Sequence, residues 1–320
     1  MIVPSDFVPA RWLPGPHLQT AWPNVSRPPP RVRLLRERLE LPDGDFLDLD
    51  RTTRESGPIV LVLHGLEGSS SSPYAAGLLK AVHARGWRGV LMHARGCSGE
   101  PNRLPRRYHA GDTGDLAYVF DELRRRAPGA AIAAVGYSLG GNVLLNWLAQ
   151  ARPPLAGAVA VSVPFDLDAT TRRLESGLSR LYQWVLLRRI YGALGEKHRR
   201  TRHPLAHRLV PRPRTLRALD DAYTAPLHGF RDAADYYRRA SCRPKLREIR
   251  MPVRILQAQD DPFTQPGSLP ATGELSEWVT LELSPGGGHV GFVSGSPWRP
   301  RYWLEERIPE YLASVWRSED

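Results

Sequence analysis

The chain has 320 residues, 42% of them hydrophobic and 24% charged, which is enough apolar material for a sizeable core and excludes global disorder. Two cysteines are too few for a disulfide framework or a cysteine-based zinc site. The net charge of +11 comes from 44 basic and 33 acidic residues, and only three of the basic residues are lysines. So strong an arginine bias says little about partners by itself.

Residues 1–57 are rich in proline and arginine, and a polar turn at 42–45 separates two runs that alternate like a hairpin. We interpret them as an N-terminal extension with the first strands packed on the core. The opening residues lack the apolar run of a secretory signal, and no stretch approaches the ~18 apolar residues of a membrane span. We therefore expect a cytoplasmic protein.

From residue 58 onward, continuous apolar runs indicate strands that are buried on both faces. They lie at 59–63, 89–92, 130–135, 157–163, 253–256 and 279–283. Helical stretches, for example 74–85, 113–126 and 140–150, lie between most of them. This alternation predicts an α/β fold with a mostly parallel central sheet and helices on both faces.

One connection is far longer than the others. Roughly 90 residues separate the strand that ends near Val163 from the next, against ~10–15 for a crossover helix. We predict a helical cap inserted at 166–244, between two core segments at 58–165 and 245–320. Residues 167–217 hold 13 basic and three acidic residues, so 13 − 3 = +10 of the net charge falls in this insertion.

Apolar residues near helical spacing run through the first part of this insertion. They are Leu174, Leu178, Leu181, Val185 and Ile190, widened by Trp184, Leu186 and Leu187, with arginines at 172, 173, 180, 188 and 189. Such a basic amphipathic helix can lie on an anionic membrane surface or attract an acidic lipid. The alternative, which we favour, is an ordinary cap helix with its apolar face on the core and its arginines in water.

Gly136-Tyr137-Ser138-Leu139-Gly140 matches the pattern G-x-S-x-G directly after an apolar strand and directly before a helix. A sharp turn at this point exposes the serine hydroxyl, and the following helix directs its N-terminus at the site. Ser138 is therefore the candidate nucleophile. Cys97 lies in a glycine-rich loop without an apparent base, and we interpret that loop as pocket wall or cap support.

A serine nucleophile needs a base and an acid that orients the base, in the chain order serine, acid, histidine. His289 lies in a glycine-rich loop after the last strand, where it could reach the serine. Asp260 and Asp261 both follow the strand at 253–256, and Asp261 is favoured because it stands two residues before Phe263. His203 and His207 have i,i+4 spacing, but no acid or cysteine completes a zinc set.

The oxyanion of an acyl-transfer reaction needs backbone N–H donors. We expect one from Leu139, the residue after the serine. The other should come from the loop 64–68 after the first apolar strand, where Leu66 is the best candidate.

Several blocks together resemble the YheT-like hydrolases, a branch of the α/β-hydrolase superfamily. They are His64-Gly-Leu-Glu-Gly-Ser, Arg95-Gly-Cys-Ser-Gly-Glu-Pro-Asn102, Gly-Tyr-Ser138-Leu-Gly-Gly-Asn, Asp-Asp261-Pro-Phe, Gly-Gly-His289-Val-Gly-Phe and the opening Pro16-His17-Leu18-Gln19-Thr20. The resemblance extends over about residues 12–312. It implies an α/β-hydrolase fold, a Ser138–Asp261–His289 triad and esterase-type chemistry. Eukaryotic relatives are associated with medium-chain fatty esters and phospholipids.

The expected function is a serine carboxylesterase that cleaves short- to medium-chain acyl esters, small or lipid, through an acyl-enzyme on Ser138, without a metal or organic cofactor. An acyltransferase with the same triad and a lipase or phospholipase-like activity at a membrane surface are alternatives. A pure binding protein for nucleic acid or anionic membrane is disfavoured, because it would not need the triad and no nucleic-acid-binding motif is present. Peripheral contact of the basic cap with an anionic membrane stays open.

Overall fold

The apolar runs form the middle of a nine-stranded sheet in a computed structural model that describes residues 1–28, 30–201 and 212–316. The strand order is β1-β9-β8-β7-β6-β4-β5-β3-β2. The strands are β1 (Ile2–Pro4), β2 (Leu34–Glu40), β3 (Phe46–Thr52), β4 (Ile59–Leu63), β5 (Arg88–Met92), β6 (Ile132–Tyr137), β7 (Gly157–Val161), β8 (Val253–Ala258) and β9 (Val279–Ser284). All neighbours pair in parallel except β2 with β3 and β3 with β5. The predicted mostly parallel sheet is confirmed.

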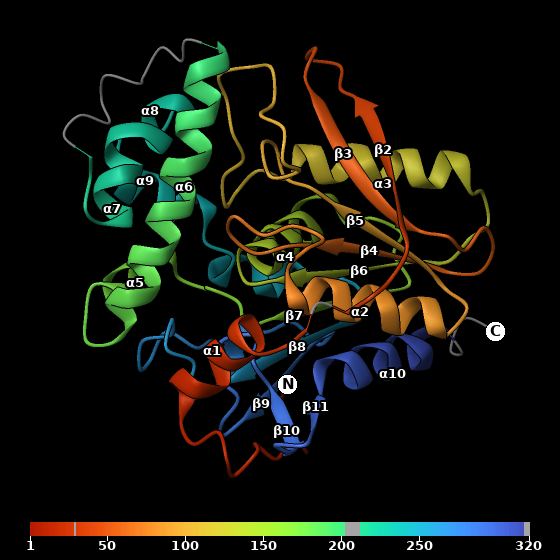
Figure 1. Cartoon of the computed structure of the whole chain (residues 1–320). Helices are drawn as coiled ribbons and strands as arrows, with labels where there is room; N and C mark the ends of the chain where they lie inside the picture. Colours follow the sequence, from red (N-terminus) through yellow and green to blue (C-terminus); the bar gives the residue numbers. More distant parts are fainter. Residues whose placement is uncertain (29, 202–211, 317–320) are drawn as a thin grey trace.

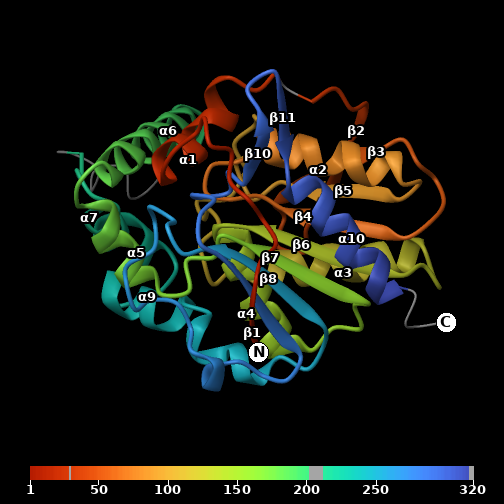
Figure 2. The ribbon, with the colours of Figure 1, turned by 90° about the horizontal axis from the view of Figure 1, so that it is seen from below.

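Helices cover both faces of this sheet, as predicted (Figures 1 and 2). The helices outside the long β7–β8 connection are α1 (Pro16–Val25), α2 (Pro73–Ala84), α3 (Gly114–Arg126), α4 (Leu139–Ala151), a 3₁₀ turn η4 (Thr272–Glu274) and α10 (Leu304–Trp316). Side chains of β4 alternate between two cores. Leu61 and Leu63 pack with the residues of α3 and α4, whereas Val60 and Val62 pack with those of α2 and α10. Burial on both faces explains why the strands are apolar throughout.

The connection between β7 and β8 is helical. It contains α5 (Leu167–Leu174), α6 (Ser179–Thr201), α7 (Leu216–Leu219), a π-helical turn η2 (Asp220–Thr224), α8 (Ala225–Leu227), α9 (Ala233–Ala240) and a 3₁₀ helix η3 (Arg243–Glu248). α5 to α9 lie together at one side of the sheet (Figures 1 and 2), and α1 lies near the N-terminal end of α6, where His17 contacts Tyr182. No helix in the described ranges is long and apolar enough to cross a membrane. The cytoplasmic location stays a prediction.

The prediction of which residues form the packed apolar face of the insertion is wrong in part. Leu174 belongs to α5, and α6 begins only at Ser179, so the two segments do not form one helix. The packed face of α6 is instead made by Gln183, Leu187, Ile190 and Leu194, which are all buried. Because that face is rotated away from positions 178, 181 and 185, the apolar side chains at those positions are exposed.

The N-terminal residues contribute to both edges of the sheet. The predicted hairpin is confirmed as β2–β3, which ends one edge. The short β1, not expected from the sequence, pairs in parallel with β9 at the other edge. A second hairpin of β10 (Val293–Ser296) and β11 (Arg299–Tyr302) lies outside the sheet.

Candidate active site

Ser138 stands between β6 and α4 in a strained backbone conformation, with φ 50° and ψ −118°. Two glycines make this turn feasible. A Cβ on Gly136 would lie 2.5 Å from the carbonyl oxygen of Gly140, and a Cβ on Gly140 would lie 2.5 Å from that of His64. No side chain fits at either distance, so the motif keeps the strand and helix in contact and leaves the serine hydroxyl exposed to the cavity.

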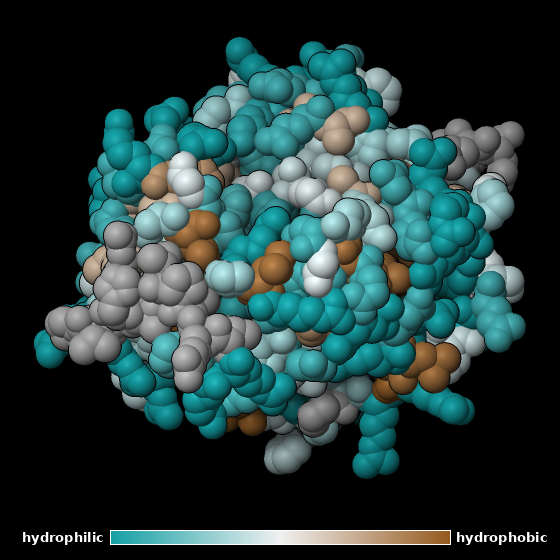
Figure 3. Space-filling model, turned by 90° about the horizontal axis from the view of Figure 1, so that it is seen from above, coloured by the Kyte–Doolittle hydropathy of each residue, from teal (hydrophilic) through white to brown (hydrophobic). Residues whose placement is uncertain are grey.

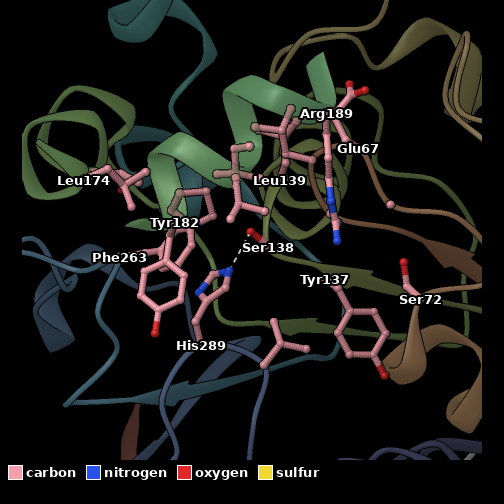
Figure 4. A pocket seen from close by; sticks show the side chains of 18 of the residues that line it. Glu67, Ser72, Tyr137, Ser138, Leu139, Leu174, Tyr182, Arg189, Phe263 and His289 are labelled. Carbon is pink, nitrogen blue, oxygen red and sulfur yellow. Dashed lines mark hydrogen bonds between the residues drawn. The ribbon is translucent and has the colours of Figure 1, made fainter. Parts of the chain in front are cut away.

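The structure brings Ser138, His289 and Asp261 together. His289 Nε2 lies 3.0 Å from Ser138 Oγ, and His289 Nδ1 lies 2.9 Å from Asp261 Oδ2. With the Nδ1 proton donated to the carboxylate, Nε2 is free to accept the serine proton. Figure 4 shows His289 directed at Ser138, with Phe263 beside it; the two rings stack with centroids 3.9 Å apart.

The two neighbouring aspartates have different partners. Asp261 is buried and also accepts hydrogen bonds from the backbone N–H of Phe263 (2.8 Å) and the side-chain amide of Gln257 (3.2 Å). Asp260 Oδ1 instead accepts from the backbone N–H of Gly288 (2.9 Å). Burial raises the pKa of Asp260. Of the two aspartates weighed in the sequence, Asp261 is thus the one that contacts the histidine.

The loop that carries His289 is held by side chains from distant parts of the chain. The backbone N–H of His289 donates to Thr20 Oγ1 (2.8 Å), and that of Val290 donates to Ser162 Oγ (2.9 Å). Gln19 accepts from the N–H of Val293 at 2.8 Å and donates to its carbonyl at 3.1 Å. Sequence reasoning assigned no role to these residues. Gln19 and Thr20 do belong to segment 16–20, which resembles the opening segment of the YheT-like hydrolases. That resemblance was the only indication in the sequence that they have a role.

Backbone donors in the loop 64–68 can be accounted for one by one. The N–H of Gly65 donates to Tyr74 Oη (2.9 Å), that of Glu67 to Tyr108 Oη (2.8 Å), and that of Gly68 to the carbonyl of Gly65 (3.0 Å). Within the described residues, the N–H groups of Leu66 and Leu139 donate no hydrogen bond, and both residues line the cavity above Ser138. The two predicted oxyanion donors are therefore available.

A cavity of about 490 Å³ opens over Ser138. Its apolar part lies beneath the β7–β8 connection and is lined by Leu174, Leu186, Ile190, Leu219 and Tyr223. Figure 4 shows Arg189 reaching from α6 toward this cavity. A polar group of His109, Asp220, His228, Tyr236 and Tyr237 lines it as well. Burial lowers the pKa of His109 to about 4 and that of His228 to about 3, so both imidazoles are neutral at pH 7.

Two other candidate chemistries receive no support. Burial raises the pKa of the Cys97 thiol to about 12, so this cysteine stays protonated and is a poor nucleophile. His203 and His207, the pair with i,i+4 spacing, lie outside the described residues. Among the residues that are described, no group of three His, Cys, Asp or Glu side chains is placed to hold a metal ion.

Comparison with known proteins agrees with this geometry. Residues 58–296 match the family described as "alpha/beta hydrolase fold". The "Putative esterase YheT" of Escherichia coli (strain K12) is 43% identical over 318 residues, which cover 97% of this chain and 94% of that protein. The chain belongs to the YheT-like α/β hydrolases.

This α/β hydrolase has relatives with several named activities. "Phospholipase ABHD3" of Mus musculus is 30% identical over 98% of this chain and 80% of its own length. "Monoacylglycerol lipase" of Saccharomyces cerevisiae (strain ATCC 204508 / S288c) is 31% identical over 85% of this chain and 61% of its own length. Among solved structures, the Pyrococcus furiosus esterase Pf2001 superposes with a TM-score of 0.57 at 14% identity, covering 97% of this chain and 96% of that one. The expected family and fold are confirmed.

Proposed function

We propose that this α/β hydrolase is a serine carboxylesterase with Ser138 as nucleophile, His289 as general base and Asp261 as the acid that orients His289. One observation carries the proposal: the continuous hydrogen-bonded chain from Ser138 Oγ through His289 to Asp261 at the base of a cavity. The relatives named as esterase, phospholipase and monoacylglycerol lipase support cleavage of an acyl ester.

In the proposed mechanism, His289 Nε2 takes the proton from Ser138 Oγ as the oxygen attacks the ester carbonyl. The N–H groups of Leu66 and Leu139 stabilise the resulting oxyanion. Asp261 stabilises the imidazolium, which then protonates the leaving alcohol. Water, deprotonated by His289, hydrolyses the acyl-enzyme and restores Ser138.

We infer that residues 166–244 act as a cap and that its apolar side chains receive the acyl chain of the substrate. Several contacts tie this segment to the rest of the site. Ser179 Oγ donates to the carbonyl of Pro262 (2.8 Å), and Tyr182 hydrogen-bonds His17 (3.1 Å). At the far end of α6, the buried Lys197 Nζ donates to Asn102 Oδ1 (2.6 Å). These contacts hold α6, whose Leu186 and Ile190 line the cavity of about 490 Å³, and we propose that this cavity accepts short to medium acyl chains.

Hydrolysis of p-nitrophenyl esters from acetyl to palmitoyl tests the proposal. We expect activity that peaks at one chain length and falls about 10⁴-fold or more in Ser138→Ala. Ser176→Ala, an exposed serine outside the cavity, is the matched control and should keep full activity. A folded wild-type protein that hydrolyses none of the esters would contradict the esterase proposal.

The same acyl-enzyme could transfer its acyl group to an alcohol, which sequence and fold do not distinguish from hydrolysis. Product analysis with added alcohol separates the two reactions. An esterase releases mainly the free acid, whereas an acyltransferase yields mainly the new ester.

A further inference from the structure

The outward face of α6 carries large apolar side chains where a helix packed on a protein core ordinarily presents polar ones. Leu181 is 62% exposed, Trp184 56% and Val185 38%, and Leu178 just before the helix is 61% exposed. The opposite face, with Leu187, already packs inside the protein. The exposed side chains therefore contribute nothing to the apolar core of the described chain.

The neighbouring helix α1 extends this apolar surface. Leu18 is 48% and Val25 82% exposed. α1 lies beside α6 in Figure 2, and the rings of His17 and Tyr182 stack between the two helices. We call these six residues the entrance patch: Leu18, Val25, Leu178, Leu181, Trp184 and Val185. By contrast, the face seen from above is mainly hydrophilic, with hydrophobic residues only in separate spots (Figure 3).

The entrance patch is continuous with the cavity over Ser138. Val25 and Val185 are exposed and also line that cavity, so the cavity reaches the surface between α1 and α6. An apolar substrate that enters the protein at this patch can therefore reach Ser138 through a cavity lined by apolar side chains.

The positive charge around the entrance patch indicates which kind of partner can bind there. From Ser176 to Gly195 the sequence holds three arginines, at 180, 188 and 189, and no acidic residue. Within the described ranges none of the three forms an ion pair, and the Arg188 guanidinium lies over the Trp184 ring at 4.8 Å. A two-fold contact with a second copy would place these arginines against their own equivalents. An anionic lipid bilayer accepts both the apolar side chains and the arginines.

We propose that the entrance patch docks the protein on the surface of anionic lipid membranes, with Trp184 and Leu181 inserted among the lipids and Arg180 and Arg188 on the headgroups. The cavity mouth then faces the bilayer, so ester substrates enter from the lipid phase. Docking is a binding property, so it can be measured whether or not the esterase proposal holds.

Co-sedimentation with lipid vesicles tests this docking. Wild type should sediment with vesicles of phosphatidylcholine and phosphatidylglycerol, far less with phosphatidylcholine alone, and less as salt rises. Leu181→Ser/Trp184→Ser should weaken binding about tenfold or more. Arg180→Gln and Arg188→Gln should each weaken it roughly fivefold. Trp298→Ser, which removes a tryptophan that is 90% exposed on the β10–β11 hairpin, should bind like wild type.

Neither Leu181 nor Trp184 lines the cavity, so hydrolysis of a soluble short-chain ester and the circular dichroism of the double variant should match wild type. Equal binding of wild type and the double variant would overturn the proposal, as would failure of wild type to sediment with anionic vesicles. Light scattering that shows a wild-type dimer and a monomeric double variant would also overturn it, because the patch would then join two copies of the chain.

Discussion

Asp260 and Asp261 are adjacent in sequence, yet each carboxylate stabilises a different part of the site. Asp261 contacts the His289 ring at 2.9 Å, whereas Asp260 accepts a hydrogen bond from the backbone of the same loop. We predict that Asp261→Asn lowers kcat about 10⁴-fold, because an amide holds the imidazole in the wrong tautomer. Asp260→Asn keeps an oxygen acceptor for the Gly288 N–H and should stay within about tenfold of wild type. Steady-state ester hydrolysis of both variants decides this; equal losses would contradict the assignment.

Asp220 is a half-buried carboxylate in the cavity wall, and its surroundings favour the protonated form. It accepts a hydrogen bond from Tyr237 Oη (2.7 Å) and lines the cavity, and burial raises its pKa to about 6. A raised folded pKa means that the stability linked to the protonated form is complete below the ordinary value near 4 and is lost as pH rises through 6.

Asp220→Asn should therefore raise the melting temperature above that of wild type at pH 8 and give no gain at pH 4. Asp121→Asn, at an exposed carboxylate, serves as the control and should show little change at either pH. A gain for Asp220→Asn that is the same at both pH values would show that charge is not the cause.

At the scale of elements, the turn from β6 into α4 depends on contacts that only glycine permits. A Cβ on Gly140 would clash with the carbonyl oxygens of His64 and Leu63, at 2.5 and 2.7 Å. We predict that Gly140→Ala costs about 3 kcal/mol or more of unfolding free energy and abolishes activity, since it moves the serine and the oxyanion loop apart. Gly192→Ala, in α6 with nothing within 4 Å, should instead stabilise the protein by up to about 1 kcal/mol. Urea unfolding measures both; loss of stability in both would refute the argument.

The sequence predicted those elements whose determinants are local. Apolar runs such as 59–63 gave the strands, and the glycines around Ser138 gave the sharp turn, because both depend on neighbouring residues. The support of His289 by Thr20 was not predictable in this way, since 269 positions separate the two residues. The exposed face of α6 was missed because helical spacing alone does not reveal which of two apolar stripes packs inward. The three-residue β1 carries too little pattern to detect.

The molecule as a whole should lose stability as the pH falls below neutral. His64, His109 and His228 are held neutral, because burial lowers their pKa values to about 4, 4 and 3. The unfolded chain binds protons at these histidines near pH 6.5, so stability is complete above that pH and falls as pH drops toward 4. Asp220 opposes this trend in the same range, so the slope should be steeper in Asp220→Asn. Urea unfolding between pH 7 and 4 measures the change of the unfolding free energy with pH. An unfolding free energy of Asp220→Asn that does not change over this range would contradict the lowered pKa values of the three histidines.

Most of the net charge of the molecule falls in the β7–β8 connection. Thirteen basic residues within 167–217 fall on this connection, which lines the cavity and contributes four of the six residues of the entrance patch. Under the two proposals, substrate access and bond cleavage take place in different layers of the same fold. The first depends on α1 and α6, and the second on the ends of β6, β8 and β9.

Labelling of the intact protein with a fluorophosphonate, followed by peptide mass spectrometry of the adduct, tests whether Ser138 is the nucleophile. We expect one rapid adduct, on Ser138, that is absent in Ser138→Ala and forms far more slowly in His289→Ala. An adduct on another residue, or no adduct on the folded wild-type protein, would contradict the assignment of Ser138 as the activated nucleophile.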